Sequence, residues 1–251
     1  GTGSYQKQLV PAAALRAVKK LDGKLRAYLA ESSLPWDDGK VLVPSVTFDK
    51  TMAEARALIG QREQAVAEFA QQYPRYVTEA QAALGALFDA DQYPTPDKIE
   101  AAFAVKIEFE ALPSGADFRC DLPASAVAQI QASIEAGVVR RFGEAHSALW
   151  ERLRDAVSHM AEKLAVPAGE PGGTFHDTLV TNLRELCAVL PGLNVAGDAA
   201  LTEALAEISA KLGTAAPAVL REQPDARARV AAAAREIEQK LGGFLAGSAS
   251  T

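Results

Sequence analysis

The sequence predicts a mainly α-helical fold. We expect a long antiparallel helical stalk, similar to a coiled coil, with a small α+β tip that contains a β-hairpin, and a C-terminal helical segment. Apolar residues make up 49% of the chain but aromatic residues only 6%, and alanine, the strongest helix former, lets helices approach closely. Two long segments, 46–73 and 125–164, carry apolar residues at spacings of three and four, the pattern of an amphipathic helix.

The segment 46–73 has the clearest helical pattern. Its apolar residues alternate between spacings of four and three, as in the seam of a coiled coil. The predicted seam consists of Phe48, Met52, Ile59, Arg62, Val66 and Phe69, and Ala55 and Tyr73 complete the two heptad positions. Arg62 interrupts the apolar pattern, and a single polar residue in a seam can fix the register of the paired helices.

The segment 125–164 predicts the longest helix. At 1.5 Å per residue, about 40 residues extend over about 60 Å. A helix of this length cannot bury its apolar stripe alone, so it needs a partner. We expect it to run antiparallel to 46–73, with the residues between the two helices at one end of the stalk.

Residues 90–122 predict the tip of the stalk. Between 105 and 110, apolar residues alternate with charged ones, which is the period of a half-buried strand. Turn-forming residues follow at 112–117, and 118–122 can return as the second strand of a hairpin. Because an isolated hairpin is marginally stable in water, we expect packing against a helix or a third strand, for which 41–43 is the candidate.

The predicted organisation follows from these segments and from a change in composition near residue 166. A Val-Pro-Ala-Gly-Glu-Pro-Gly-Gly run there is typical of a linker. The predicted parts are a probable cloning scar at 1–4, the stalk with its tip at 5–165, the linker at 166–173, the C-terminal helical segment at 174–245 and a flexible tail at 246–251.

No pattern in the sequence predicts catalytic residues, a cofactor site or a metal site. His146 and His159 fall on the same expected helix, about 19 Å apart along its axis, so they cannot share a metal ion, and we expect His159 to be structural or on the surface. Phosphate-binding loops, zinc-protease motifs and the serine-nucleophile elbow are absent. Cys120 and Cys187 are expected to be small buried hydrophobes, although the sequence leaves a disulfide open.

Two short segments are candidates for binding a partner. Residues 36–38 form a predicted loop with an exposed aromatic side chain, a frequent binding anchor; the alternative is a turn in which the Asp side chains accept backbone hydrogen bonds. Residues 117–119 form either a recognition edge at the tip or a cross-strand contact with Phe109. The candidate partner-binding residues are Trp36, Asp37, Asp38, Asp117, Phe118 and Arg119.

The charge balance makes nucleic acid an improbable partner. The formal net charge is −6, and an acidic chain repels a phosphate backbone unless its basic residues are segregated. Arg140, Arg141, Arg152 and Arg154 are spread around their expected helix rather than gathered on one face. No apolar run approaches the roughly 18 residues of a membrane span, and no signal peptide is visible, so the sequence predicts a location in the cytoplasm.

Four short motifs occur in order along the chain: Leu-Pro-Trp-Asp-Asp-Gly at 34–39, Tyr-Pro-Thr-Pro at 93–96, Asp-Phe-Arg at 117–119 and Leu-Pro-Gly-Leu-Asn at 190–194. Through them, over about residues 20–200, the chain resembles a family of tailed-bacteriophage and mobile-element proteins often encoded near MoxR-like AAA+ ATPases and von Willebrand A-type proteins. The resemblance implies a phage-related setting in a bacterial host cell and an ATPase-associated partner. It supplies no activity and no catalytic residues.

The sequence favours a non-enzymatic, self-associating interaction protein, an adaptor or modulator of a phage-linked assembly. The predicted seam and the lack of a catalytic pattern motivate this hypothesis. Two alternatives stay open: a nucleic-acid-associated factor in phage replication or recombination, and a helical pore-forming protein with a β tongue. The charged face of 105–110 disfavours the second alternative, because a membrane-inserting tongue should be strongly apolar.

Overall fold

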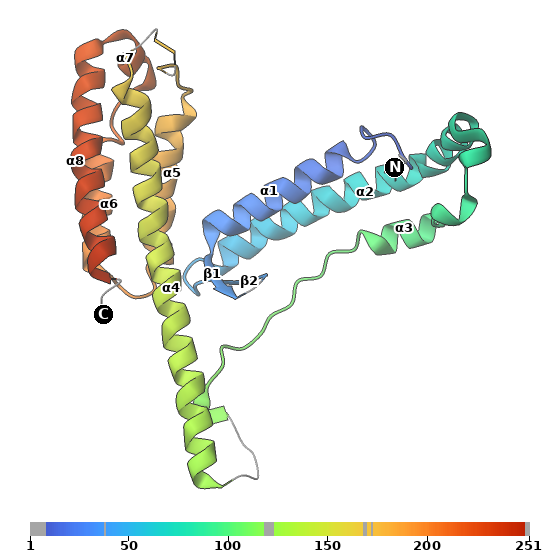
Figure 1. The fold of residues 1–251 in the computed structure, drawn as a ribbon, viewed down its shortest axis with the longest axis horizontal. Helices are drawn as coiled ribbons and strands as arrows, with labels where there is room; N and C mark the ends of the chain where they lie inside the picture. Colours follow the sequence, from blue (N-terminus) through green and yellow to red (C-terminus); the bar gives the residue numbers. More distant parts are fainter. Residues whose placement is uncertain (1–8, 38, 118–122, 168–169, 172, 249–251) are drawn as a thin grey trace, which may run out of the picture. The chain divides into compact units, whose positions relative to one another are not determined.

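The computed structural model describes residues 9–37, 39–117, 123–167, 170–171 and 173–248, and its fold is mainly α-helical, as predicted (Figure 1). In these residues the one sheet has two strands. The contacts divide the chain into two units, which we treat separately. Unit 1 comprises residues 1–29 and 49–110, and unit 2 comprises residues 30–48 and 111–251.

Unit 1 is built on two antiparallel helices, α1 (Arg16–Ser32) and α2 (Phe48–Leu84), which lie side by side in Figure 1. Val18 of α1 packs with Ala65 and Val66 of α2. Further along the pair, Leu15 lies against the cluster of Phe69 and Tyr73. The short elements η1 (Gly85–Leu87), η2 (Ala90–Gln92) and α3 (Pro96–Ala102) follow, and α3 closes this cluster with its buried side chain, Ile99.

The predicted seam lies on the buried face of α2, but its partner differs from the expected one. Met52, Arg62, Val66 and Phe69 are buried, Ile59 is half-buried and Phe48 is 36% exposed. Val66 and Phe69 pack on α1 and α3, where we expected the helix at 125–164. Heptad spacing predicts that a face is covered, not which helix covers it. The connection from α1 to α2, residues 33–47, is shorter than the one from α2 to α4, residues 85–123, so α1 is the nearer helix along the chain.

Arg62 is the polar residue of this interface, and it is fully engaged. Its Nε donates to Asp22 Oδ1 at 2.5 Å, and its Nη1 donates to the carbonyl of Phe103. The guanidinium carbon also lies 5.8 Å from the centroid of the Phe103 ring. One side chain therefore links α1, α2 and the end of α3, which suits a residue that sets the register of the pair.

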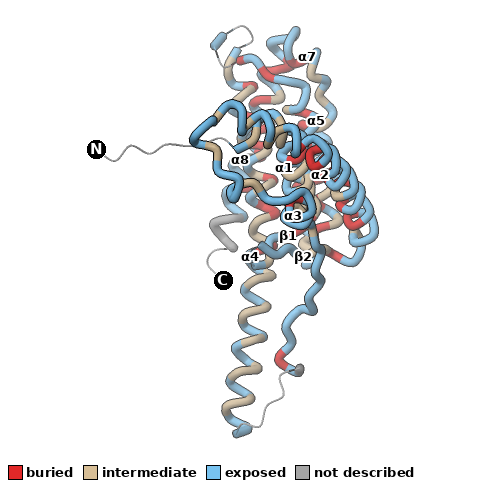
Figure 2. The backbone as a smooth tube through the Cα atoms, turned by 90° about the vertical axis from the view of Figure 1, so that its right-hand side faces the viewer, coloured by how far each residue is buried: buried red, intermediate tan, exposed pale blue. Residues whose placement is uncertain are grey.

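The described residues of unit 2 form a hairpin and five α-helices. The hairpin strands are β1 (Leu34–Asp37) and β2 (Lys40–Leu42), and η3 (Gly115–Asp117) precedes the helices. The helices are α4 (Ala124–Ala165), α5 (Thr178–Leu193), α6 (Ala199–Lys211), α7 (Pro217–Glu222) and α8 (Pro224–Ser248). The buried side chains of α4 begin only at Ala145, so the core surrounds its C-terminal half, as Figure 2 shows.

One continuous apolar cluster holds unit 2 together. It joins Leu153 and Val157 of α4 to Leu183 of α5, Ile208 of α6 and Ile237 of α8, and each of these side chains is at most 2% exposed. Residues 174–245 therefore share a core with α4, and the predicted linker at 166–173 lies inside a unit. A Pro/Gly-rich segment can connect two helices of one core as well as two separate domains.

Asp198 fastens the start of α6 to α4. Its Oδ1 accepts the backbone N–H of Ala200 at 2.8 Å as a helix N-cap, and its Oδ2 accepts the indole N–H of Trp150 at 3.1 Å. His146 Nε2 lies 3.0 Å from the same Oδ2. Burial alone would raise the pKa of Asp198, but hydrogen bonds from Leu201, Trp150 and Ala200, with the charge of His146, outweigh it and lower the pKa.

The hairpin lies elsewhere than predicted. Residues 104–114 form neither helix nor strand, and 118–122 lie outside the described residues. The observed hairpin pairs Leu34 with Leu42 and Pro35 with Val41, so the strand candidate at 41–43 was correct for its first two residues but had the wrong partner. A tight turn brings the partner strand within reach: Gly39 has φ +71°, which glycine adopts without strain. Residues 105–110 have the alternation of a strand but, among the described residues, no neighbouring strand with which to pair.

Replacing Arg62 should destabilise unit 1. In Arg62→Ala, Asp22 loses its ion pair and the Phe103 carbonyl loses its donor, so we expect a loss of about 2–3 kcal/mol in the free energy of unfolding. Urea unfolding followed by circular dichroism measures it. Arg56→Ala, at an exposed position of the same helix, is the matched control and should change stability by less than about 0.5 kcal/mol. Equal effects of the two substitutions would contradict the assigned role.

Asp198 should make the protein sensitive to acid. Because its folded-state pKa lies below its ordinary value, its charge stabilises the fold above the unfolded pKa, and this contribution is lost as the pH falls through the folded pKa. Asp198→Ala should therefore lower stability by about 1 kcal/mol at pH 7, and the difference from the unmodified protein should shrink near pH 3. Urea titrations at both pH values test this, with exposed Glu203→Gln as control. A pH-independent difference would rule out the charge as the cause.

Candidate functional site: a groove between α4 and α5

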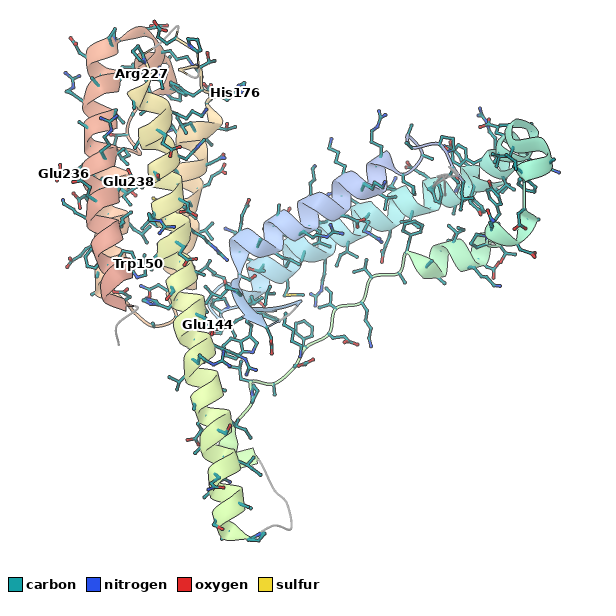
Figure 3. All side chains as sticks on the ribbon, in the orientation of Figure 1. Glu144, Trp150, His176, Arg227, Glu236 and Glu238 are labelled. Atoms are coloured by element: carbon teal, nitrogen blue, oxygen red, sulfur yellow. The ribbon has the colours of Figure 1, made fainter. Side chains whose placement is uncertain are left out.

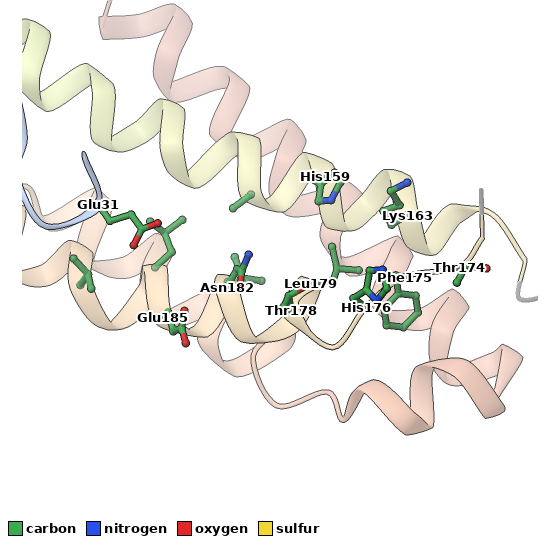
Figure 4. Close-up of a pocket in the computed structure, with 14 residues that line it drawn as sticks. Glu31, His159, Lys163, Thr174, Phe175, His176, Thr178, Leu179, Asn182 and Glu185 are labelled. Carbon is green, nitrogen blue, oxygen red and sulfur yellow. The ribbon is translucent and has the colours of Figure 1, made fainter. Parts of the chain in front are cut away.

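A hollow of about 620 Å³ lies between α4 and α5 in unit 2 (Figure 4). It continues along the segment before α5 and reaches the last turn of α1. Its volume falls in the range of about 300–1,000 Å³ that is typical of ligand-binding clefts. The residues that line it are Glu31, Ala156, His159, Lys163, Thr174, Phe175, His176, Thr178, Leu179, Asn182, Leu183, Glu185, Leu186 and Val189.

The floor of the groove is apolar. Leu179, Leu183 and Leu186 follow the spacing of four and three that places side chains on one face of α5. Leu183 is 1% exposed and belongs to the core, whereas Leu179 and Leu186 are only half-buried. On the α4 side, Ala156 contributes a small side chain. The helices therefore leave apolar surface that neither of them covers.

The two ends of the groove have opposite charges. Lys163 and His159 lie on one face of α4, four residues apart, and His176 joins them from the segment before α5. Glu31 and Glu185 lie at the other end, as Figure 4 shows. In the described part of the chain, the side chains of Lys163 and Glu185 form no hydrogen bond or ion pair. Their charges are therefore available to a ligand.

A buried arginine from α8 holds the basic end in place (Figure 3). Arg227 is 3% exposed, and its Nη2 donates to the carbonyls of Lys163 at 2.8 Å and Gly173 at 2.7 Å, while its Nε donates to the carbonyl of Leu164 at 3.2 Å. Burial lowers the pKa of Arg227. Its three acceptors connect the end of α4 with the segment that leads into α5, and they satisfy carbonyls that a helix end leaves without partners.

Phe175 is fixed by two arginines. The guanidinium carbons of Arg221 and Arg227 lie 5.1 and 5.3 Å from the centroid of its ring. Arg221 also bonds to Asp177. These contacts therefore hold the backbone of the neighbouring residues Thr174 and His176 in place, although the side chains of both residues are exposed.

The structure brings two of the predicted partner-binding residues together on α4. Trp36 is half-buried, with its ring 5.0 Å from that of Phe142 at an interplanar angle of 70°. Asp37 forms an ion pair of 3.3 Å with Arg141. Both line a second hollow, of about 300 Å³, with Pro35, Arg140, Arg141 and Glu144. These contacts anchor the hairpin on α4.

Asp38, Phe118 and Arg119 lie outside the described residues, and of Asp117 only the backbone is described, in η3. Sequence reasoning missed the groove between α4 and α5. The spacing of His159 and Lys163 was visible, but His176 joins them only through the path of the chain between α4 and α5.

The arginines considered for nucleic acid are engaged within unit 2. Arg140 pairs with Glu144 at 2.9 Å, and Arg154 with Asp155 at 2.9 Å. Arg152 is half-buried and donates to the carbonyl of Ser33 at 3.0 Å, and burial lowers its pKa. With Arg141 committed to Asp37, these four residues do not form a free basic face.

Cys187 is half-buried beside the core of unit 2, and burial raises the pKa of its thiol. Cys120 lies outside the described residues. Among the described residues, no group of three or more His, Cys, Asp or Glu side chains is placed to hold a metal ion, and no helix is both long and apolar enough to cross a membrane.

No family model, curated protein or solved structure matches this chain. The fold and the groove together define its class by structure alone: a helical protein with an open, apolar groove between two helices.

Loss of the Arg227 side chain should destabilise unit 2 and loosen the basic end of the groove. Arg227→Met keeps much of the apolar stem but leaves three carbonyls without their donor, so we expect a loss of at least about 2 kcal/mol in the free energy of unfolding. Hydrogen exchange should also accelerate at the last turn of α4 and at 173–176. Arg229→Met, at an exposed position two residues on, is the control. Unchanged hydrogen exchange at these two segments in Arg227→Met would refute the anchoring role of Arg227.

Proposed function

We propose that this chain is a non-enzymatic protein-interaction module, an adaptor or modulator of a larger assembly, and that the groove between α4 and α5 is its docking surface. The observation that carries the proposal is the uncovered apolar floor formed by Leu179, Leu186 and Val189. Half-buried leucines at helical spacing are what a helix-in-groove interface requires of its receptor. The charged ends then add specificity.

The dimensions of the groove favour a segment of a protein over a compact small molecule. Thr178 and Val189 both line it, and their separation of 11 positions along α5 corresponds to about 16 Å. That length equals about three turns of a helix. Most of the rim, including Thr178, Asn182 and Glu185, is exposed to solvent, so a ligand can enter from the side along the whole length.

The proposed setting is phage-related, in the cytoplasm of a bacterial host, with the assembly built around an AAA+ ATPase. This proposed setting rests on the four sequence motifs and on the groove between α4 and α5, to which a component of such an assembly can bind. Self-association stays a prediction of the sequence. Because Val66 and Phe69 of the seam are covered within unit 1, a second copy would have to bind elsewhere.

A photo-crosslinking amino acid tests the docking surface in the host cell. Placed at Asn182, on the exposed rim of the groove, it should give one discrete adduct, which mass spectrometry then identifies. Placed at Arg229, an exposed position away from the groove, it should not. The added substitution Leu179→Asp, which puts a charge on the apolar floor, should abolish the Asn182 adduct. Adducts that are the same at both positions, or that survive Leu179→Asp, would refute the proposal, as would no adduct at either.

A further inference from the structure

The charges of the groove differ from those on the opposite side of unit 2. On α6 and α8, Glu207 pairs with Lys211 at 2.7 Å and with Lys240 at 2.8 Å, and Lys240 also reaches Glu236 at 3.0 Å. That network is complete within the fold. Lys163 and Glu185 in the groove have no such partners among the described residues. The same helical unit therefore satisfies its charges on one face and leaves them uncommitted on the other.

The polar side chains of the groove are also sorted along its length. Lys163 lies with the polar His159 and His176 at the end near Phe175, and Glu185 lies with Glu31 at the other end. A ligand that lies along the floor must therefore meet Lys163 at one end and Glu185 about two helical turns further along α5, since Glu185 follows Thr178 by seven residues. Binding is strongest when the ligand carries the opposite charges in the same order.

We infer that the groove binds an amphipathic helix of a partner protein, with acidic residues in its first turn and basic residues in its last turn. This inference rests on the proposed function and adds the chemistry and direction of the partner segment. Acidic side chains stabilise the N-terminus of a helix and basic ones its C-terminus, so this order of charges is compatible with a stable helix. Such a segment has about 11 residues, with apolar side chains at positions i, i+4 and i+7 on the floor.

The charges also fix the orientation of the segment. Its acidic N-terminal turn lies at Lys163, where α5 begins, and its basic C-terminal turn lies at Glu185 and Glu31. The bound helix therefore runs in the same direction as α5. The reverse orientation would place like charges together at both ends, which weakens binding.

Two designed peptides of identical composition test this inference with the full chain. The first has two Glu residues in its first turn, three Leu residues at i, i+4 and i+7, and two Lys residues in its last turn. The second exchanges the Glu and Lys residues. Fluorescence anisotropy should show that the first peptide binds about tenfold more tightly than the second, because a few exposed ion pairs of up to about 1 kcal/mol each are gained at the ends.

Exchanging the charges of the protein should reverse this preference. In the double variant Lys163→Glu/Glu185→Lys, the second peptide should bind more tightly than the first. The single variant Glu185→Lys should lower the affinity for the first peptide, because it repels only the basic last turn of that peptide. This variant serves as the test if the double variant does not fold. Arg229→Glu, outside the groove, should change neither affinity, and circular dichroism checks that each variant is folded.

The outcomes separate this inference from the proposed function. Three results would overturn the inference of a partner helix with an acidic first turn and a basic last turn. They are equal affinities for the two peptides, no measurable binding of either below 1 mM, and an unchanged preference in both charge variants. The crosslinking result at Asn182 would stand in each of these cases. Conversely, if the peptides bind in the expected order but no adduct forms in the host cell, the inferred chemistry holds and the docking function fails.

Discussion

The side chain of Arg227 is the interaction on which the arrangement of unit 2 depends. It carries a charge into a nearly fully buried position, where its three hydrogen bonds go to the backbone carbonyls of Lys163, Leu164 and Gly173. Burying a guanidinium is costly unless its donors are satisfied, so the contact holds only while α4, α8 and the segment before α5 stay together. The position of the basic end of the groove is a consequence of this constraint.

The groove itself follows from the composition of the chain. The small side chains of an alanine-rich helix leave space beside it. Large side chains of the neighbouring helix fill this space in some places, and a channel remains where they do not. Ala156 faces the groove from α4, and Leu179 and Leu186 of α5 are half-buried beside it. Half-buried leucines contribute less to folding than fully buried ones, so the fold gains little from closing this channel.

Local patterns in the sequence predicted the helices well, but they could not choose the partners of those helices. The spacing of three and four located α2 and α4, and it marked Arg62 as the polar residue of a helical interface, which the bonds to Asp22 and Phe103 explain. Alternation at 105–110 was misleading, because a strand needs a neighbour as well as a pattern. The groove was not predictable in the same way: His176 joins His159 and Lys163 only through the path of the chain between α4 and α5, which Arg227 holds in place.

The two charged faces of unit 2 contribute differently to the molecule. On α6 and α8, hydrogen bonds from Lys211 and Lys240 lower the pKa of Glu207, the mark of a carboxylate whose charged form is stabilised by its partners. Lys163 and Glu185 have no such partners in the described chain, so they add little to folding and can be exchanged with little effect on it. Residues that the fold does not need can specify a partner, because changing them alters recognition without altering stability. In this protein the charges at the ends of the groove meet that condition, while Arg227 and the apolar core keep them at a fixed separation.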